Sequence, residues 1–327
     1  MTSIHTTRAA EVAPVPLAVA RERLERLVGN VERAIFGKRR QVVLAVVGVL
    51  AEGHILLEDV PGTGKTTLAR ALARSLDLEF RRVQFTSDLL PSDVLGVSVL
   101  DRRTGEFAFK PGPVFANVVL ADELNRTTPR TQSALLESMN DRRVSIDGRT
   151  YDLPRPFLVV ATQNPLEFEG TYPLPESQLD RFLLRIAMGY PAPDDERRVL
   201  RARAAGEDVD RLVPVLTRDE MSSLVALTRQ VRVDPAIEDY VLALLDGTRR
   251  GGRFALGLST RAGVALVRAA QALALTAGRD YAIPDDVKEL ALPVLAHRVV
   301  PSAVAAADAA GGDRLIAELL ERTPVPA

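Results

Sequence analysis

The feature that most restricts the fold is the segment DVPGTGKT at positions 59–66. It follows a short apolar run at 55–58, which predicts a buried strand, and precedes a periodic segment at 67–76, which predicts a helix. It fits the pattern G-x-x-x-x-G-K-[ST], except that Asp59 replaces the first glycine. Glycines in such a loop let backbone N–H groups turn toward a phosphate, and the helix adds its positive end. The sequence therefore predicts a phosphate-binding loop.

The residue types in this loop indicate a nucleotide and a metal ion. Lys65 is expected to reach the β- and γ-phosphates, and the Thr66 hydroxyl to ligate Mg²⁺. The alternative is a glycine-rich turn with a solvated lysine, which the strand–loop–helix context disfavours. The residues predicted to bind the nucleotide here are Gly62, Thr63, Gly64, Lys65, Thr66 and Thr67.

A second motif, VVLADE at 118–123, is an apolar strand that ends in two acids, the form of a Walker-B motif. Asp122 is expected to hold Mg²⁺, directly or through water, and Glu123 to orient and polarise an attacking water. Alone, the motif is also typical of an ordinary strand before a polar turn. Because a phosphate loop precedes it, and because the Asn-Lys-x-Asp motif of GTPases is absent from the sequence, we predict a hydrolase of ATP.

Three further polar residues are candidates for the same site. Asn164 follows a predicted strand and is expected to hydrogen-bond the γ-phosphate and the attacking water, although Asn-Pro is also a common turn starter. Arg181 is expected to reach a neighbouring subunit's nucleotide, and Arg261 to reach back to the γ-phosphate. For both arginines the alternative is a solvated or ion-paired surface side chain.

The order of predicted elements indicates an α/β fold. Strands are predicted at 55–58, 79–85, 118–121, 157–161 and 182–188, alternating with helices, which is typical of a parallel sheet. Hairpin signals around Gly105 and Gly148 predict two insertions. After Tyr190 only helices follow. We therefore predict a flexible leader at 1–16, an α/β core at 17–190 and an all-helical domain at 191–327.

Composition excludes several other chemistries. Among 327 residues there is no cysteine and there are only three histidines, which excludes thiol catalysis and disfavours a His-based metal centre or triad. The balance of 42 basic and 43 acidic residues disfavours a nucleic-acid footprint over the whole surface. No signal peptide is evident, and the longest apolar run, 42–51, is too short to span a bilayer. We predict a cytoplasmic protein with no membrane span.

Together these motifs resemble the AAA+ ATPases and, within them, the MoxR family. The stretches that carry the resemblance are GHILLE at 53–58, GPVFA at 112–116, ADELNR at 121–126, QSALLE at 132–137 and EGTYPLPE at 169–176. The resemblance implies a P-loop core with five parallel strands, followed by a helical lid. It also implies a homo-oligomeric ring, usually a hexamer, with ATP bound between neighbours.

The resemblance also assigns roles to single residues. Asn164 corresponds to sensor 1, Arg181 to the arginine finger and Arg261 to sensor 2. Gly37, with the two residues before it, corresponds to the stretch near the adenine. The two predicted hairpins correspond to inserts near the central pore. His54 and Arg126 lie in stretches that match the family, but the resemblance assigns them no catalytic role.

Three functions remain open at this point. A MoxR-type ATPase would remodel or mature a separate partner protein, expected to contain a von Willebrand factor A domain. A ring-shaped nucleic-acid motor is the second possibility, because basic pairs at 102–103 and 142–143 accompany the hairpins. The third is a chelatase motor subunit. The near-zero net charge favours a protein partner over nucleic acid.

Overall fold

The computed structural model describes residues 15–164, 170–206, 209–250, 252–307 and 311–326, so most of the predicted leader lies outside it. Its centre is a five-stranded, all-parallel sheet in the order β2-β5-β8-β1-β9. The strands are β1 (His54–Glu58), β2 (Phe80–Gln84), β5 (Val118–Asp122), β8 (Leu158–Gln163) and β9 (Phe182–Ile186). The predicted parallel α/β sheet is confirmed.

Alternate residues of the central strands pack into two separate cores, one on each face of the sheet. Val118 and Leu120 join the larger core with α1 (Leu17–Glu32), α2 (Arg39–Leu50) and α3 (Lys65–Ser75). Val119 and Ala121 join the smaller core beneath α5 (Pro129–Asp141). This burial on both faces explains why the strand β5 is apolar throughout until its final acid.

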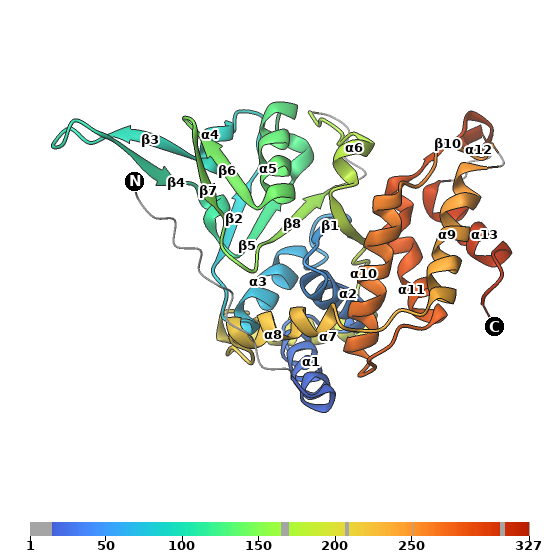
Figure 1. The fold of residues 1–327 in the computed structure, drawn as a ribbon. Coiled ribbons are helices and arrows are strands. Elements are labelled where there is room, and N and C mark those ends of the chain that lie inside the picture. Colours follow the sequence, from blue (N-terminus) through green and yellow to red (C-terminus); the bar gives the residue numbers. More distant parts are fainter. Residues whose placement is uncertain (1–14, 165–169, 207–208, 251, 308–310, 327) are drawn as a thin grey trace, which may run out of the picture.

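Both predicted hairpins are present as insertions outside the sheet. The first, β3 (Gly96–Leu100) with β4 (Phe107–Pro111), follows the short helix α4 (Pro91–Leu95) and extends away from the core (Figure 1). The second pairs β6 (Arg143–Ile146) with β7 (Arg149–Asp152). Phe109 and Tyr151 stack with ring centroids 4.2 Å apart, so the two hairpins contact each other.

The helices that follow the sheet form two groups. The segment with α7 (Pro193–Ala204), the 3-10 turn η3 (Val209–Arg211) and α8 (Arg218–Thr228) lies along α1 and α3 (Figure 1). There the backbone N–H groups of Val215 and Leu216 both donate to the Ser75 carbonyl oxygen. These helices therefore pack on the core, although they follow the predicted domain boundary at 190.

The second group forms a separate, mainly helical body beside β9 and α2 (Figure 1), which also contains one short antiparallel strand pair that the sequence did not predict. Its elements are α9 (Pro235–Arg249), β10 (Phe254–Leu256), α10 (Thr260–Thr276), α11 (Pro284–Leu295), η4 (Ala296–Arg298), β11 (Val300–Pro301), α12 (Ala303–Ala307) and α13 (Gly312–Arg322). Among the described helices, none is both long and apolar enough to cross a membrane.

Candidate active site

Residues 59–64 form a loop between β1 and α3, as predicted, although the helix begins at Lys65, two positions before its predicted start. Gly62 and Gly64 have φ angles of 85° and 92°, a left-handed backbone that side chains with a Cβ rarely adopt. Lys65 starts the helix, and its Nζ donates to the carbonyl oxygens of Asp59 (2.6 Å) and Val60 (2.9 Å). The lysine thus lies folded over its own loop.

Three carboxylates lie close enough to Lys65 to act on its charge. Burial lowers the pKa of Lys65, while the charges of Asp59, Asp122 and Glu123 act in the opposite direction. Because these acids influence the lysine electrostatically, the loop and the end of β5 face one site. The two motifs that the sequence places 50 to 60 positions apart along the chain are therefore neighbours in space.

Asp59, the residue that departs from the P-loop pattern, connects the loop to the end of the core. Its Oδ1 accepts a hydrogen bond from the Val60 N–H (2.7 Å), and its Oδ2 accepts one from the Gly189 N–H. A glycine at this position has no side chain to make either bond. The aspartate therefore fixes the start of the phosphate loop against the chain that leaves β9.

A pocket of about 530 Å³ lies beside the glycines of the loop. Its lining includes Ile35 and Phe36 on one side and Val199 and Leu200 of α7 on another. Gly37 has a φ of 67°, and a Cβ there would collide with the Asp195 carboxylate. A largely apolar pocket next to a phosphate loop suits a nucleotide base. Gly37 is not among the described lining residues, and its predicted place near the adenine remains a prediction.

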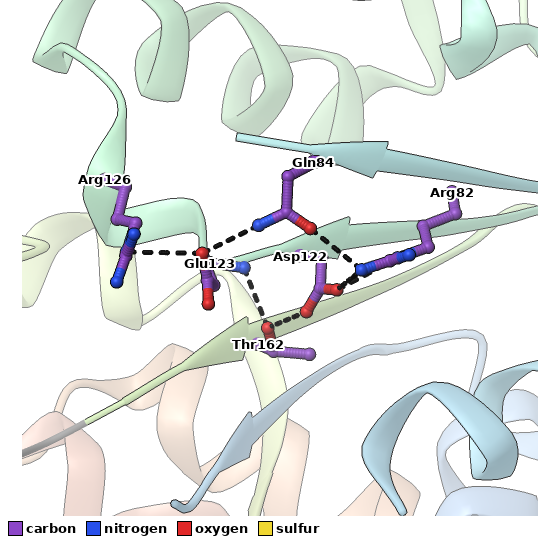
Figure 2. Close-up of polar contacts among 6 residues, drawn as sticks. All are labelled: Arg82, Gln84, Asp122, Glu123, Arg126 and Thr162. Carbon is purple, nitrogen blue, oxygen red and sulfur yellow. Dashed lines mark hydrogen bonds and ion pairs between the residues drawn. The ribbon is translucent and has the colours of Figure 1, made fainter. Parts of the chain in front are cut away.

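The first acid of the second motif, Asp122, is 9% exposed and bonded through both oxygens. Its Oδ1 accepts from the Thr162 hydroxyl (2.6 Å). Its Oδ2 accepts from both Nε (3.0 Å) and Nη2 (2.7 Å) of Arg82 on β2, as Figure 2 shows. The carboxylate is therefore held by the two strands that flank β5.

The second acid, Glu123, is held by side chains from two directions (Figure 2). Gln84 Nε2 donates to its Oε2 (2.7 Å), and Arg126 Nε lies 3.2 Å from the same oxygen. The backbone N–H of Glu123 donates to the Thr162 hydroxyl oxygen (2.8 Å). Because Arg82 Nη2 also donates to Gln84 Oε1 (2.9 Å), the contacts around both acids form one closed network.

Asn164 directly follows β8, and β8 lies between β5 and β1 in the sheet. The carboxyl ends of parallel strands meet at one edge of a sheet. This edge therefore brings together the phosphate loop, Asn164 and the two acids. The predicted roles of Asn164, Thr66 and Thr67 remain predictions.

The two predicted arginines, Arg181 and Arg261, lie outside the pocket beside the phosphate loop. Arg261 instead lies close to the segment that carries Arg181. Among the described residues that line the pocket beside the phosphate loop, neither Arg181 nor Arg261 is present. Arg261 Nη2 donates to Asn140 Oδ1 (3.0 Å), and its Nε lies 3.7 Å from Asp180 Oδ2. The structure thus groups Arg261 with the segment that carries Arg181, not with the phosphate loop of its own chain.

One guanidinium nitrogen of Arg181 makes no hydrogen bond to the described residues. This nitrogen, Nη1, is buried and has no hydrogen-bond partner within the described part of the chain. Its neighbour Asp180 forms ion pairs with Arg261 and with the buried Arg298 of η4. The Nε of Arg298 lies 3.2 Å from Oδ1 of Asp180. The helical domain therefore contacts the chain immediately before Arg181.

Sequence reasoning missed three residues that contact the acids: Arg82, Gln84 and Thr162. Arg82 and Gln84 are two residues apart on β2, opposite Leu120 and Asp122 of β5. Alternation along a strand puts such residues on one face, but the strand pairing that places them beside the acids is not visible in the sequence.

Comparisons with known proteins agree with this geometry. A family model described as "ATPase family associated with various cellular activities (AAA)" matches residues 54–184, and the AAA lid domain matches 247–319. YeaC of Bacillus subtilis, an uncharacterized protein, is 46% identical and aligns with 93% of this chain and 95% of its own.

Two further relatives cover nearly the whole chain. The chaperone MoxR1 of Mycobacterium tuberculosis is 41% identical over 95% of this chain and 84% of its own. A crystal structure of a Cytophaga hutchinsonii protein has a TM-score of 0.88 and 36% identity, covering 95% of this chain and 97% of that one. The chain therefore belongs to the MoxR family of AAA+ ATPases, enzymes that hydrolyse ATP.

Proposed function

We propose that this protein hydrolyses ATP with Mg²⁺ to remodel or mature a separate partner protein. The observation that carries the proposal is the convergence of the phosphate loop with two acids at one sheet edge. The description of the M. tuberculosis relative as a chaperone supports a protein as the target. A protein with a von Willebrand factor A domain is the partner that we expect.

The residues at this edge fit a magnesium ion. Carboxylate and hydroxyl oxygens are the ligands that Mg²⁺ prefers, and Asp122 and Thr66 would supply them together with the phosphates. When bound, the ion would neutralise charge on the phosphate oxygens. No described group of three or more His, Asp and Glu side chains forms an independent metal site, so the ion is expected to bind with the nucleotide.

In the proposed reaction each side chain has a defined task. Lys65 leaves its own loop carbonyls and binds the β- and γ-phosphates, since a phosphate offers a charged acceptor. Glu123 accepts hydrogen bonds from the attacking water and orients it toward the γ-phosphorus, and Asn164 holds the same water from β8. The pocket walls of α7 and of residues 35–36 hold the adenine.

We propose that the nucleotide lies between subunits of a homo-oligomeric ring, with six as the expected number. Arg181 has a buried nitrogen without a described partner and lies outside its own chain's nucleotide pocket. An arginine in such a position suits the neighbour's γ-phosphate. Arg261 lies beside the same segment, and we propose that it serves the same neighbouring site.

The exposed hairpin β3–β4 supports a protein partner. Val99 is 49% exposed, Leu100 48% and Phe107 69%, so a strip of apolar surface extends from the core. Apolar surface of this kind is typical of protein contacts, whereas nucleic-acid contacts are dominated by cations. Adding single-stranded DNA should therefore leave the hydrolysis rate unchanged, and a strong stimulation that disappears at high salt would favour a nucleic-acid motor.

The enzymatic part of the proposal is tested with two purified variants. Lys65→Ala should lose ATP binding, measured with a fluorescent nucleotide, because a charge-assisted contact to the phosphates is removed. Glu123→Gln should bind ATP and lose phosphate release, because an amide is a poor base for water. Turnover like that of the wild type in either variant would refute the assignment. The proteins that co-purify with Glu123→Gln in ATP would identify the partner.

A further inference from the structure

Arg82 places a positive charge on the carboxylate that is expected to hold the metal ion. Asp122 Oδ2 accepts two N–H groups of the same guanidinium, at 3.0 and 2.7 Å (Figure 2). A carboxylate oxygen has about two lone-pair directions, so Oδ2 is fully used. The other oxygen, Oδ1, accepts the Thr162 hydroxyl at 2.6 Å.

We propose that Arg82 is an internal competitor of the divalent cation: it occupies Asp122 in the resting protein and must leave before the metal binds tightly. This inference rests on the proposed Mg²⁺–nucleotide site. The competition follows from charge, because a guanidinium and a divalent cation repel each other across one carboxylate. It also follows from geometry, because the guanidinium takes both lone-pair directions of Oδ2 and leaves a cation only the remaining direction of Oδ1.

The position of Arg82 allows it to be released. Its side chain is 51% exposed and lies on β2, one of the two edge strands of the sheet, whereas the Asp122 side chain is only 12% exposed. A guanidinium that moves from this edge into solvent is hydrated again, so its release costs little. A buried arginine in the same ion pair would instead be a fixed part of the site.

The release also affects the second acid. Arg82 Nη2 donates to Gln84 Oε1, and the amide of Gln84 donates to Glu123 Oε2. When Arg82 leaves, Gln84 loses the contact that orients its amide. Asp122, which is expected to hold the metal ion, and Glu123, which is expected to orient the water, are therefore linked through one exposed arginine.

The test measures metal affinity directly and does not depend on turnover. The full chain is saturated with ADP and titrated with Mn²⁺, an EPR-visible substitute for Mg²⁺. Arg82→Gln should bind Mn²⁺ about tenfold more tightly than the wild type, because a unit charge is removed a few ångströms from the ion. Arg82→Lys, which keeps the charge but not the two-pronged contact, should fall between the two. Unchanged or weaker Mn²⁺ binding by Arg82→Gln would overturn the proposal.

The matched control is the preceding residue. Arg81 is on the opposite face of β2, where its Nη2 lies 2.9 Å from Glu79 Oε1. Arg81→Gln removes the same charge from the same strand and should leave Mn²⁺ affinity unchanged. A gain as large as that of Arg82→Gln would show only a general field effect and would also overturn the proposal.

Two further measurements keep the result interpretable. Binding of ADP in EDTA should be equal in all variants, and Arg82→Met repeats the test with another neutral side chain if Arg82→Gln folds poorly. If the wild type binds ADP without any dependence on Mn²⁺, the proposed function fails, and this inference fails with it. If the wild type shows that dependence and Arg82→Gln shows no gain, only the competition is refuted.

Discussion

At the scale of single residues, Asp59 stands where the P-loop pattern has a glycine, and its side chain holds the loop in place. Its carboxylate bonds the N–H groups of Val60 and Gly189, and it helps to balance the charge of Lys65. We expect Asp59→Ala to weaken ADP binding about tenfold, because two charge-assisted bonds that shape the loop are lost. Fluorescent-nucleotide titration measures this. Asp59→Asn, which keeps one acceptor, should lose less, and an Asp59→Ala affinity equal to that of the wild type would contradict the role.

Two buried histidines make stability depend on pH. His54 Nδ1 accepts from the Val159 N–H (3.0 Å), so Nε2 must carry the proton that faces the Met139 carbonyl oxygen (3.1 Å). Burial, as the main cause, lowers the pKa of His54 to about 4 and that of His297 to about 3. For His54, the charge of Arg142 adds to this effect. His54 is therefore a neutral structural residue at pH 7.

The sign of the pH dependence follows from these values. In the unfolded chain a histidine binds its proton near pH 6.5, whereas the folded protein does not protonate His54 until about pH 4. Stability is therefore complete above pH 6.5 and is lost as the pH falls from there toward 4. Between pH 7.5 and 5.5 we expect a loss of about 1 kcal/mol for each histidine.

Urea unfolding at these two pH values checks this expectation. His54→Asn should be less stable at pH 7.5 and should show a smaller loss at pH 5.5 than the wild type. A pH dependence that is unchanged in the double variant of His54 and His297 would assign the effect to other groups.

At the scale of elements, the sequence predicted what periodicity and turn signals determine. Every strand of the sheet and both hairpins lie within a few positions of their predicted ranges, because apolar runs and Asp-Gly or Thr-Gly pairs mark them locally. The helices α4 and α6 (Glu176–Leu179) were missed, since helices of five and four residues contain too little periodicity to detect. Contacts between elements were missed for a different reason: Arg82 reaches Asp122 only through the pairing of β2 with β5.

Two ion pairs join the helical domain to the sheet region, Arg298–Asp180 and Arg185–Asp313. We expect the first to contribute more to the free energy of unfolding than the second. Arg298 is buried, with a side chain 4% exposed, and burial lowers its pKa to about 10. Its partner Asp180 partly compensates this cost, and the Phe182 carbonyl oxygen accepts from Nη2 at 2.7 Å. Removing the charge of Asp180 leaves a buried cation with less compensation.

We expect Asp180→Asn to lower the free energy of unfolding by about 1–3 kcal/mol. Asp313→Asn is the matched control, because Asp313 of α13 pairs with Arg185 of β9 and also joins the helical domain to the sheet. Asp313 is 60% exposed, so its loss should cost under about 0.5 kcal/mol. Chemical denaturation of both variants measures the difference, and equal losses would contradict the importance of burial.

At the scale of the whole molecule, the structure separates the residues that meet within one chain from the two arginines that our proposal assigns to a neighbouring chain. The phosphate loop, the pocket and both acids come together within one chain, whereas Arg181 and Arg261 lie outside that pocket. Repeated head-to-tail contacts close into a ring when the rotation allows it, so each site would combine two neighbouring surfaces. The sequence predicted this division for Arg181 but assigned Arg261 to the nucleotide of its own chain, because the distance between segments is set only by the folded chain.

Mixing two inactive variants tests whether the site is shared. Arg181→Ala keeps both acids, and Glu123→Gln keeps the arginine, so a mixed ring contains some interfaces in which both groups are intact. Random assembly at equal concentrations gives about a quarter of such interfaces, and we expect phosphate release to return to about that share of the wild-type rate. Mixing Lys65→Ala with Glu123→Gln is the control, because both changes affect the half-site that one chain supplies and every interface stays defective. Rings that form normally and show no rescue by Arg181→Ala at any ratio would exclude Arg181 as the residue that acts on the neighbour's nucleotide.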